Sequence, residues 1–349
     1  MLFTIILAGY HTAPYLPQAL DSIRAQSFRD FDVICYVEES PDDSLAICRA
    51  AEQADPRFHV VSAPKSGAVA STRNYGIEHA LGDYLVVLDG DDWIVPDMLA
   101  ELAAKLAATG EVDVLSFAAV TTETDTVDME HAPRLSNFRA DDQKEVFTGP
   151  EAIRRAGRNG GKMCNHTVLS IYRTQFLREN RIRQTPGRLM EDFESTPRIW
   201  FAAKRFAYLD EAFYVYRRRP GSLTTEASSR IAFDLVAQFR SLLDFADGID
   251  VPPDILAIWS NQWLSILFWF LFHPVTSRKL DRAERRQALA ILFAGEGEKL
   301  FCKLCRRASF PKRAAAPLIR RAARGWQFPA EFYFRKLYYP LVERGGKSR

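Results

Sequence analysis

An acidic cluster at the end of an apolar segment is the strongest candidate for chemistry in this sequence. Asp89, Asp91 and Asp92 directly follow the apolar run Tyr84–Leu88. Three carboxylates within four positions repel one another, so clustering them is costly unless a cation lies among them. Oxygen ligands favour a hard ion such as Mg²⁺ or Mn²⁺, and so few protein ligands imply that a diphosphate supplies the others. The alternative is structural, with Asp92 capping a short helix that follows.

Apolar segments alternate with helical patterns before this cluster, and they predict how it is positioned. Strands are expected at residues 3–8, 31–37, 58–62 and 84–88, and helices at residues 14–26, 44–53 and 70–81. Continuous apolar strands between helices are typical of a parallel sheet covered on both faces. Ligands of such sheets bind at the carboxyl ends of the strands. This rule directs attention to Tyr10 and Glu38 as well as to Asp89.

The rest of the chain indicates a second half of the α/β domain, followed by a helical region. Residues 121–142 are polar and irregular and are expected to form a loop. The other expected elements are strands at 112–120 and 206–216 and helices at 98–109, 151–158, 173–180 and 188–203. From residue 229 onward, helix-forming composition dominates. The sequence therefore predicts an α/β domain over residues 1–228 and a helical C-terminal region over residues 229–349.

The composition is that of a globular protein. The chain has 349 residues, of which 47% are hydrophobic and 26% charged, and this excludes a disordered or collagen-like chain. Its five cysteines are odd in number and irregularly spaced, which favours a reducing cytosol over a disulfide framework. Cys302 and Cys305 have no second Cys/His pair and are interpreted as core residues rather than zinc ligands. Residues 1–8 are interpreted as a buried strand rather than a secretory signal, and residues 255–272 as a buried helix, with a membrane span as the alternative.

The net charge of +2 conceals a basic C-terminal tail. Residues 299–349 carry 14 Lys/Arg and two Asp/Glu, a net of +12, which leaves −10 for residues 1–298. Aromatic residues are interleaved with the basic ones in this tail. Such a segment suits an anionic membrane surface, with aromatic rings at headgroup depth and basic groups on phosphates. The alternatives are a solvated basic face on the helical region, an anionic glycan acceptor and partner subunits, whereas nucleic acid is not expected as a partner.

Five ordered blocks give the sequence a resemblance to the family 2 glycosyltransferases. They are the apolar strand Ile5–His11, the G-G-x-x-x-A-R-N-x-G-like block Ser66–Gly76, the F-L-D-S-D-D-W-like block Val87–Trp93, the E-D motif Met190–Phe193 and the Y-x-Y-R-x-R-x-G-S-x-T-like block Tyr214–Thr224. The resemblance implies the GT-A fold, a Rossmann-like, mostly parallel mixed sheet with helices on both faces, followed here by a C-terminal α-helical subdomain. It further implies a nucleotide-sugar-binding half over residues 1–95 and an acceptor-side half over residues 96–228.

The activity implied by this resemblance is metal-dependent, inverting transfer of a sugar from a nucleotide-sugar, most often UDP-linked. The acceptor would be a hydroxyl of a glycan or lipid-linked glycan in cell-surface polysaccharide synthesis, such as capsule or lipopolysaccharide. Mn²⁺ or Mg²⁺ would be held by Asp91 with Asp89 and Asp92, and Asp192 would be the general base, with Glu191 as the alternative. The enzyme is expected in the cytoplasm, peripherally attached to the inner face of the plasma membrane.

Further residues are assigned to the nucleotide-sugar by the same resemblance. Tyr10 would stack on the base, Arg73 would lie near the nucleotide, and Arg217 and Arg219 would clamp phosphates. Glu38 stands where the family has an aspartate that meets the uracil ring. The alternative for Tyr10, Arg73, Arg217 and Arg219 is a purely structural role, and His166 is interpreted as structural rather than as an acceptor contact.

Two other functions compete with glycosyl transfer. A sugar nucleotidyltransferase also uses clustered aspartates on a related α/β sheet, and a scaffold subunit of a polysaccharide assembly complex would need no catalysis. The E-D motif and the closing arginine block disfavour the first. The intact Asp89, Asp91 and Asp192 disfavour the second.

Overall fold

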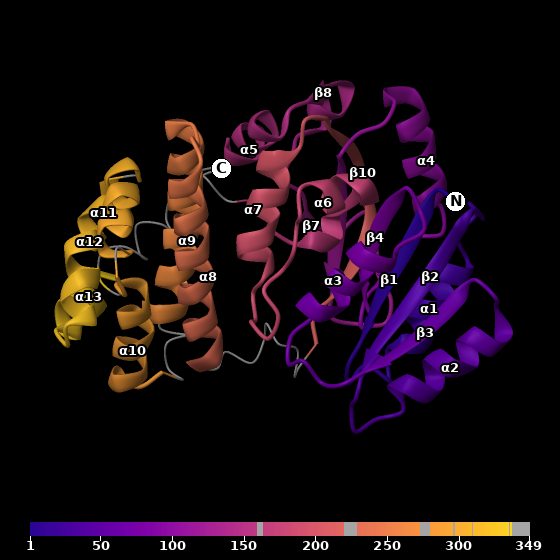
Figure 1. Ribbon diagram of the computed structural model, residues 1–349, viewed down its shortest axis with the longest axis horizontal. Helices are drawn as coiled ribbons and strands as arrows, with labels where there is room; N and C mark the ends of the chain where they lie inside the picture. Colours follow the sequence, from indigo (N-terminus) through magenta and orange to yellow (C-terminus); the bar gives the residue numbers. More distant parts are fainter. Residues whose placement is uncertain are drawn as a thin grey trace. The chain divides into compact units, whose positions relative to one another are not determined.

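A mixed β-sheet organises the first two thirds of the protein (Figure 1). The computed structural model describes residues 1–158, 163–219, 229–272, 280–295, 297–308, 310–334 and 336. Within these residues the sheet has ten strands, in the order β3-β2-β1-β4-β9-β6-β10-β5, with β7 paired to β6 and β8 to β10. The strands are β1 (Phe3–Gly9), β2 (Phe31–Glu38), β3 (Phe58–Ala63), β4 (Tyr84–Asp89), β5 (Trp93–Ile94), β6 (Val114–Thr122), β7 (Arg134–Leu135), β8 (Val146–Phe147), β9 (Ser170–Arg173) and β10 (Phe206–Arg217).

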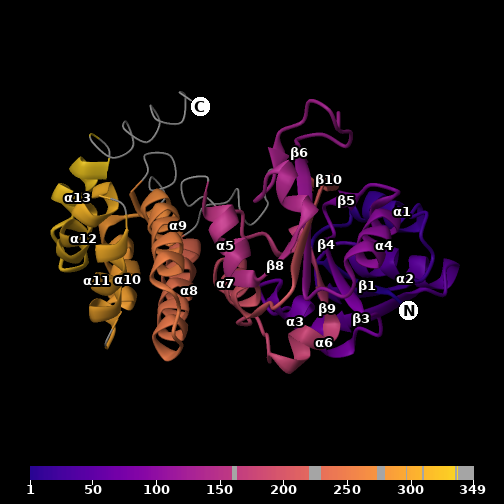
Figure 2. The same cartoon turned by 90° about the horizontal axis from the view of Figure 1, so that it is seen from above.

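Helices cover both faces of this sheet (Figure 2). They are α1 (Leu16–Arg24), α2 (Ser44–Ala54), α3 (Ala70–His79), α4 (Met98–Thr109), α5 (Gly149–Gly157), α6 (Thr174–Glu179) and α7 (Asp192–Ala202). On one face the segment that follows α1 is joined to α4, since Gln26 Oε1 accepts a bond from the Leu99 amide. On the other face Arg178, in α6, donates to the carbonyl of Ile77 in α3. Because both faces are covered, every residue but one of β1 is buried, as its continuous apolar sequence predicts.

The strand order combines parallel and antiparallel pairing. The pairs β1–β2, β2–β3, β1–β4 and β6–β10 are parallel, whereas β9 lies antiparallel between β4 and β6. The predicted α/β class with a mixed sheet is therefore confirmed, and the longer strand pairs are the parallel ones. The strand β9 was not predicted, because its four residues are too few to show a periodic pattern.

Two stretches of the predicted secondary structure are wrong. The helix expected over residues 188–203 begins only at Asp192, because Met190 has a left-handed backbone (φ 60°) that no α-helix accommodates. The loop expected over residues 121–142 contains β7 and the start of a short 3₁₀-helix, Ala140–Lys144. Both errors lie where the chain departs from a regular period.

The chain divides into two compact units. The first, here called the sheet unit, comprises Met1–Arg155 and Cys164–Pro220, and the second, the helical unit, comprises Ala156–Met163 and Gly221–Arg349. Described helices of the second unit are α8 (Ser229–Gly248), α9 (Pro253–Phe272), α10 (Arg282–Leu292), α11 (Gly297–Arg307), α12 (Phe310–Ala323) and α13 (Gln327–Tyr333).

The apolar helix α9 forms the core of the helical unit. Among the described residues it is the one helix long and apolar enough to cross a membrane, and 61% of its most apolar window is buried inside the protein. Trp259 and Trp263 are almost fully buried, and the side-chain Nε2 of Gln262 donates to the carbonyl of Met163 (2.7 Å). Such burial is what a core helix requires.

Candidate active site

The acidic cluster forms a tight turn at the carboxyl end of β4. Asp89 pairs with Ala8 of β1, the amide of Gly90 donates to the Ala8 carbonyl (2.9 Å), and the amide of Asp92 donates to the Asp89 carbonyl (3.0 Å). A Cβ at position 90 would lie 2.5 Å from the Ala8 oxygen, so only glycine fits there. The turn thus fixes the three aspartates at the ligand-binding edge of the sheet.

Asp89 is oriented toward a buried arginine. Its Oδ1 atom lies 3.5 Å from Arg73 Nη2, yet this buried oxygen accepts no hydrogen bond among the described residues. Burial raises the pKa of Asp89, the Arg73 charge lowers it, and Asp91 and Asp192 raise it further. The carboxylate is therefore short of positive partners.

Asp91 has a different environment, at the outer side of the turn. Its Oδ2 atom lies 2.8 Å from Nε of Arg219, and its backbone carbonyl accepts a bond from Nε of Arg217 (2.9 Å). Arg219, just after β10, thus holds the side chain of Asp91, and Arg217, at the end of β10, holds its main chain.

Asp92 lies inside the fold, which differs from its expected place among the metal ligands. Only 2% of the residue is exposed. One carboxylate oxygen accepts from the hydroxyl of Tyr214 (2.6 Å) and the other from the amide of Arg217 (2.8 Å). Burial, with Asp91 and Asp89, raises the pKa of Asp92 well above its usual value. With both oxygens bonded to β10, Asp92 holds the acidic turn in place rather than a metal ion.

The E-D motif meets Arg73 at the start of α7. Arg73 Nη1 lies 2.5 Å from Glu191 Oε1 and 2.6 Å from Asp192 Oδ1. Carboxylates are favourable at this position because the amino end of a helix carries partial positive charge. The arginine therefore contacts three carboxylates, those of Asp89, Glu191 and Asp192, and its predicted place near the nucleotide stays a prediction.

The charges and burial of this cluster favour the protonated form of Arg73 and make Glu191 a weaker acid than usual. Burial lowers the pKa of Arg73, but Asp192, Glu191 and Asp89 outweigh that effect and raise it above its usual value. Burial raises the pKa of Glu191 to about 7, against the lowering effect of Arg73. Thr167 orients Asp192, because its hydroxyl donates to Oδ1 and its amide to Oδ2 (3.2 Å). Asp192 thus has one geometry, set by Arg73 and Thr167.

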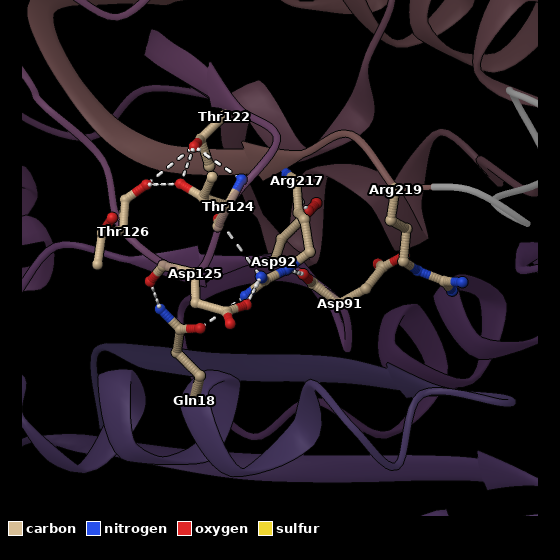
Figure 3. A network of polar contacts seen from close by, with 9 residues as sticks. All are labelled: Gln18, Asp91, Asp92, Thr122, Thr124, Asp125, Thr126, Arg217 and Arg219. Atoms are coloured by element: carbon tan, nitrogen blue, oxygen red, sulfur yellow. Dashed lines mark hydrogen bonds and ion pairs between the residues drawn. The ribbon is translucent and has the colours of Figure 1, made fainter.

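Arg217 is the centre of a polar network that supports the acidic turn (Figure 3). Its Nη2 atom donates to Gln18 (2.6 Å), and Nη1 forms an ion pair with Asp125. Its guanidinium also lies 4.8 Å from the ring centroid of Trp93. Since the donors of this buried side chain have protein partners, its geometry is that of a brace for Asp91 and Asp92 rather than of a phosphate clamp.

The two remaining candidates lie at the same edge of the sheet. Glu38, at the end of β2, is buried and accepts bonds from the amide (3.0 Å) and hydroxyl of Ser66. Tyr10 follows β1, and the ammonium of Lys65 lies 4.7 Å from its ring centroid. The predicted meeting of the carboxyl ends of β1, β2 and β4 is thus present.

Four residues at the site were not predicted. Tyr15, Gln18, Thr167 and Tyr214 contact the predicted residues, but they come from distant parts of the chain. Only Tyr214 belongs to one of the five sequence blocks.

His166 packs against Tyr216, with ring centroids 5.6 Å apart.

A divalent cation fits part of this site. Among the described residues no three His, Cys, Asp or Glu side chains converge on a complete ion site. Asp89 and Asp91 nevertheless supply carboxylate oxygens at the sheet edge, and the buried Asp89 Oδ1 has no hydrogen-bond donor. Two protein ligands leave positions for the oxygens of a diphosphate, which is how Mg²⁺ is commonly held in phosphate sites.

Comparison with known proteins identifies the family. The family model described as Glycosyl transferase family 2 matches residues 4–181. The chain is 27% identical to the glycosyltransferase EpsJ of Bacillus subtilis, covering 70% of this chain and 69% of that protein. It is 25% identical to the glycosyltransferase GlyG of Streptococcus pneumoniae, covering 72% and 83%.

Solved structures share the fold. TarS of S. aureus, residues 1–349 in complex with UDP-GlcNAc, is similar with a TM-score of 0.76 and 22% identity, covering 96% of this chain and 92% of that one. The mannosyltransferase PcManGT of Pyrobaculum calidifontis, in complex with GDP-Man and Mn²⁺, is similar with a TM-score of 0.53 and 18% identity, covering 93% and 86%. The predicted GT-A fold with a helical C-terminal region is confirmed, and the chain belongs to glycosyl transferase family 2 and is a glycosyltransferase.

Proposed function

We propose that this enzyme transfers a sugar from a UDP-linked donor to a hydroxyl of a glycan or lipid-linked glycan, with inversion at the anomeric carbon. The observation that carries this proposal is the contact of Arg73 with Asp89 on one side and with Glu191 and Asp192 on the other. Asp89 on the proposed donor side and Glu191 and Asp192 on the proposed acceptor side thereby form one cluster. The UDP-GlcNAc bound to TarS supports a nucleotide-sugar donor for a chain of the same fold.

The donor would bind at the carboxyl ends of β1, β2 and β4. Asp91 and Asp89 would hold Mn²⁺ or Mg²⁺, which when bound neutralises charge on a departing nucleoside diphosphate. Tyr10 would stack on the base, and Glu38 would hold the Ser66 loop against it. Arg219 would contact the diphosphate, since a guanidinium suits planar bidentate contacts.

Asp192 would act as the general base. The acceptor oxygen forms a bond to the anomeric carbon while the bond from that carbon to the diphosphate oxygen breaks and the diphosphate leaves with the electron pair. The acceptor proton passes to a carboxylate oxygen of Asp192, and a single in-line displacement inverts the centre. Thr167 and Arg73 hold this carboxylate in place. Glu191 is the alternative base, because burial raises its pKa to about 7.

The acceptor chemistry and the site of action are proposed from the basic tail, residues 299–349. In α12 and the turn after it, Arg313, Arg321 and Arg324 are exposed at positions that share one helix face, and Trp326 next to them is 71% exposed. Guanidinium groups beside an exposed indole suit an anionic membrane surface. We therefore place the enzyme in the cytoplasm, at the inner face of the membrane, where it acts in surface-polysaccharide synthesis.

Two experiments test these proposals. A panel of nucleotide sugars with Mn²⁺ should give hydrolysis or transfer from a UDP-sugar that is lost in Asp192→Asn. Reaction of a nucleoside triphosphate with a sugar 1-phosphate instead would support a nucleotidyltransferase, and no turnover with any donor would support a scaffold.

For the membrane, flotation with phosphatidylglycerol vesicles should fail for the double variant Arg313→Glu/Arg321→Glu. The matched control Arg29→Glu/Lys144→Glu reverses two exposed charges of the sheet unit and should still float. Equal binding of the wild type to phosphatidylcholine vesicles would contradict the electrostatic attachment.

A further inference from the structure

The ion pair between Asp91 and Arg219 joins two groups that the proposed reaction uses separately. Asp91 Oδ2 lies 2.8 Å from Arg219 Nε, and both side chains are largely buried. In the reaction, Asp91 would bind a divalent cation and Arg219 would bind the diphosphate. A cation that binds Asp91 through Oδ2, alone or bidentately with Oδ1, competes with Arg219 Nε for that oxygen, and binding of the donor complex in this geometry breaks the pair.

The main chain of Asp91 does not depend on that ion pair. Its carbonyl accepts from Arg217 Nε (2.9 Å), and the neighbouring Asp92 is fixed by Tyr214 and by the Arg217 amide. Loss of Arg219 would therefore release the Asp91 side chain while the turn that carries it stays in place.

Tyr15 gives Arg219 a second contact that survives a change of partner. The Arg219 guanidinium carbon lies 4.9 Å from the Tyr15 ring centroid, and the Arg217 guanidinium carbon lies at the same distance from this ring. A cation–π contact constrains the in-plane orientation of a guanidinium much less than a hydrogen bond does. Arg219 can thus turn away from Asp91 and remain over Tyr15.

We infer that Arg219 couples the binding of the cation to that of the nucleotide. When a divalent cation binds Asp91, Arg219 leaves this carboxylate and pairs with the donor diphosphate instead. The inference rests on the proposed metal and donor sites. The cation alone displaces Arg219 from Asp91 and brings no anionic partner in exchange. In the presence of the diphosphate, the displaced guanidinium gains a bidentate anionic partner. Cation and nucleotide therefore assist each other's binding, and the coupling is reciprocal.

The test is calorimetric titration of the full chain with Mn²⁺, with and without UDP, for the wild type, Arg219→Ala, Arg219→Lys and Arg218→Ala. In Arg219→Ala, Mn²⁺ alone should bind about 3- to 10-fold more tightly, because Asp91 has lost its competing partner. UDP should then strengthen Mn²⁺ binding much less than in the wild type. Arg219→Lys should keep part of the coupling, since it keeps the charge but not the planar fork.

Arg218→Ala is the matched control. Arg218 is exposed, precedes Arg219 directly, and its removal changes the net charge equally. It should leave both Mn²⁺ affinity and coupling unchanged. Weaker or unchanged Mn²⁺ binding in Arg219→Ala, or retained coupling there, would overturn the exchange while metal-dependent transfer still stands. A wild type that binds no Mn²⁺ even with UDP would overturn both.

Discussion

The guanidinium of Arg73 lies 2.6 Å from the carboxylate of Asp192, although 119 positions separate the two residues in the chain. Arg73 is only 4% exposed and also contacts Glu191 and Asp89. Asp89, Glu191 and Asp192 share this one guanidinium, so the group stays negative whenever more than one of the three carboxylates is ionised. The arginine therefore makes a carboxylate cluster tolerable in a buried place while leaving it attractive to a metal.

Replacement of Arg73 by Met should lower the free energy of unfolding by about 3–5 kcal/mol, because the buried carboxylates lose the guanidinium that pairs with all three of them. Arg73→Lys should recover part of this loss. Denaturant unfolding measures the effect. The control is Arg183→Met, which removes a surface ion pair with Glu78 and should cost about 1 kcal/mol or less. Equal losses in the two variants would contradict a buried role for Arg73.

Asp192→Asn should lower kcat by about 10²- to 10⁴-fold, the usual contribution of a general base. The affinity for the donor, measured by titration with UDP, should change little. Glu191→Gln should lower kcat much less, because it removes a partner of Arg73 rather than the proton acceptor. If the larger loss falls on Glu191→Gln, the two residues exchange roles.

The stability of the metal-free protein should fall as the pH rises from about 5 to 8. Burial raises the pKa of Glu191 to about 7, so in this range the folded state keeps a proton that the unfolded state has released. Its stabilising contribution is complete below the unfolded pKa and is lost as the pH passes through the folded pKa. Relative to Glu191→Gln, the wild type should lose on the order of 2 kcal/mol of unfolding free energy across this range. Parallel pH profiles would refute the assignment.

Tyr214→Phe should destabilise the protein by about 1–3 kcal/mol, since it leaves an oxygen of the buried Asp92 without its hydrogen bond. Thermal unfolding checks this, with Tyr36→Phe on the half-buried surface of β2 as the control. Activity should fall as well, because Tyr214 also accepts a bond from the Asp89 amide (3.2 Å). A variant as stable and active as the control would show that the turn needs no such support.

The sequence predicts the nucleotide-side strands and helices well because their signals are local. The strands at 3–8, 31–37, 58–62 and 84–88 agree with β1 to β4 within one residue at each end. The position of Asp89 and Asp91 at a strand end follows from the same patterns. Apolar periodicity and the end of a run are properties of a few neighbouring residues, and they survive in the folded chain.

The partners of the site residues were beyond the reach of the sequence. Arg73, Asp92 and Arg217 each make their decisive bonds to residues about 90 or more positions away. No spacing rule connects a helix near residue 73 to a helix that begins at residue 192. The left-handed backbone of Met190 is a further case. Glycine adopts this conformation most readily, and no local sequence pattern predicts it for a methionine.

The antiparallel strand β9 has a consequence for how the protein is made. Residues 170–173 insert between β4 and β6, which are completed some fifty or more positions earlier. Residues 1–95 therefore end on an open edge at β4, which a truncated fragment would expose to aggregation. During synthesis the sheet closes only after β10 has left the ribosome, and β10 also delivers the bonds that hold Asp92. The bonds that hold Asp92 can therefore form only late in synthesis, once β10 is available.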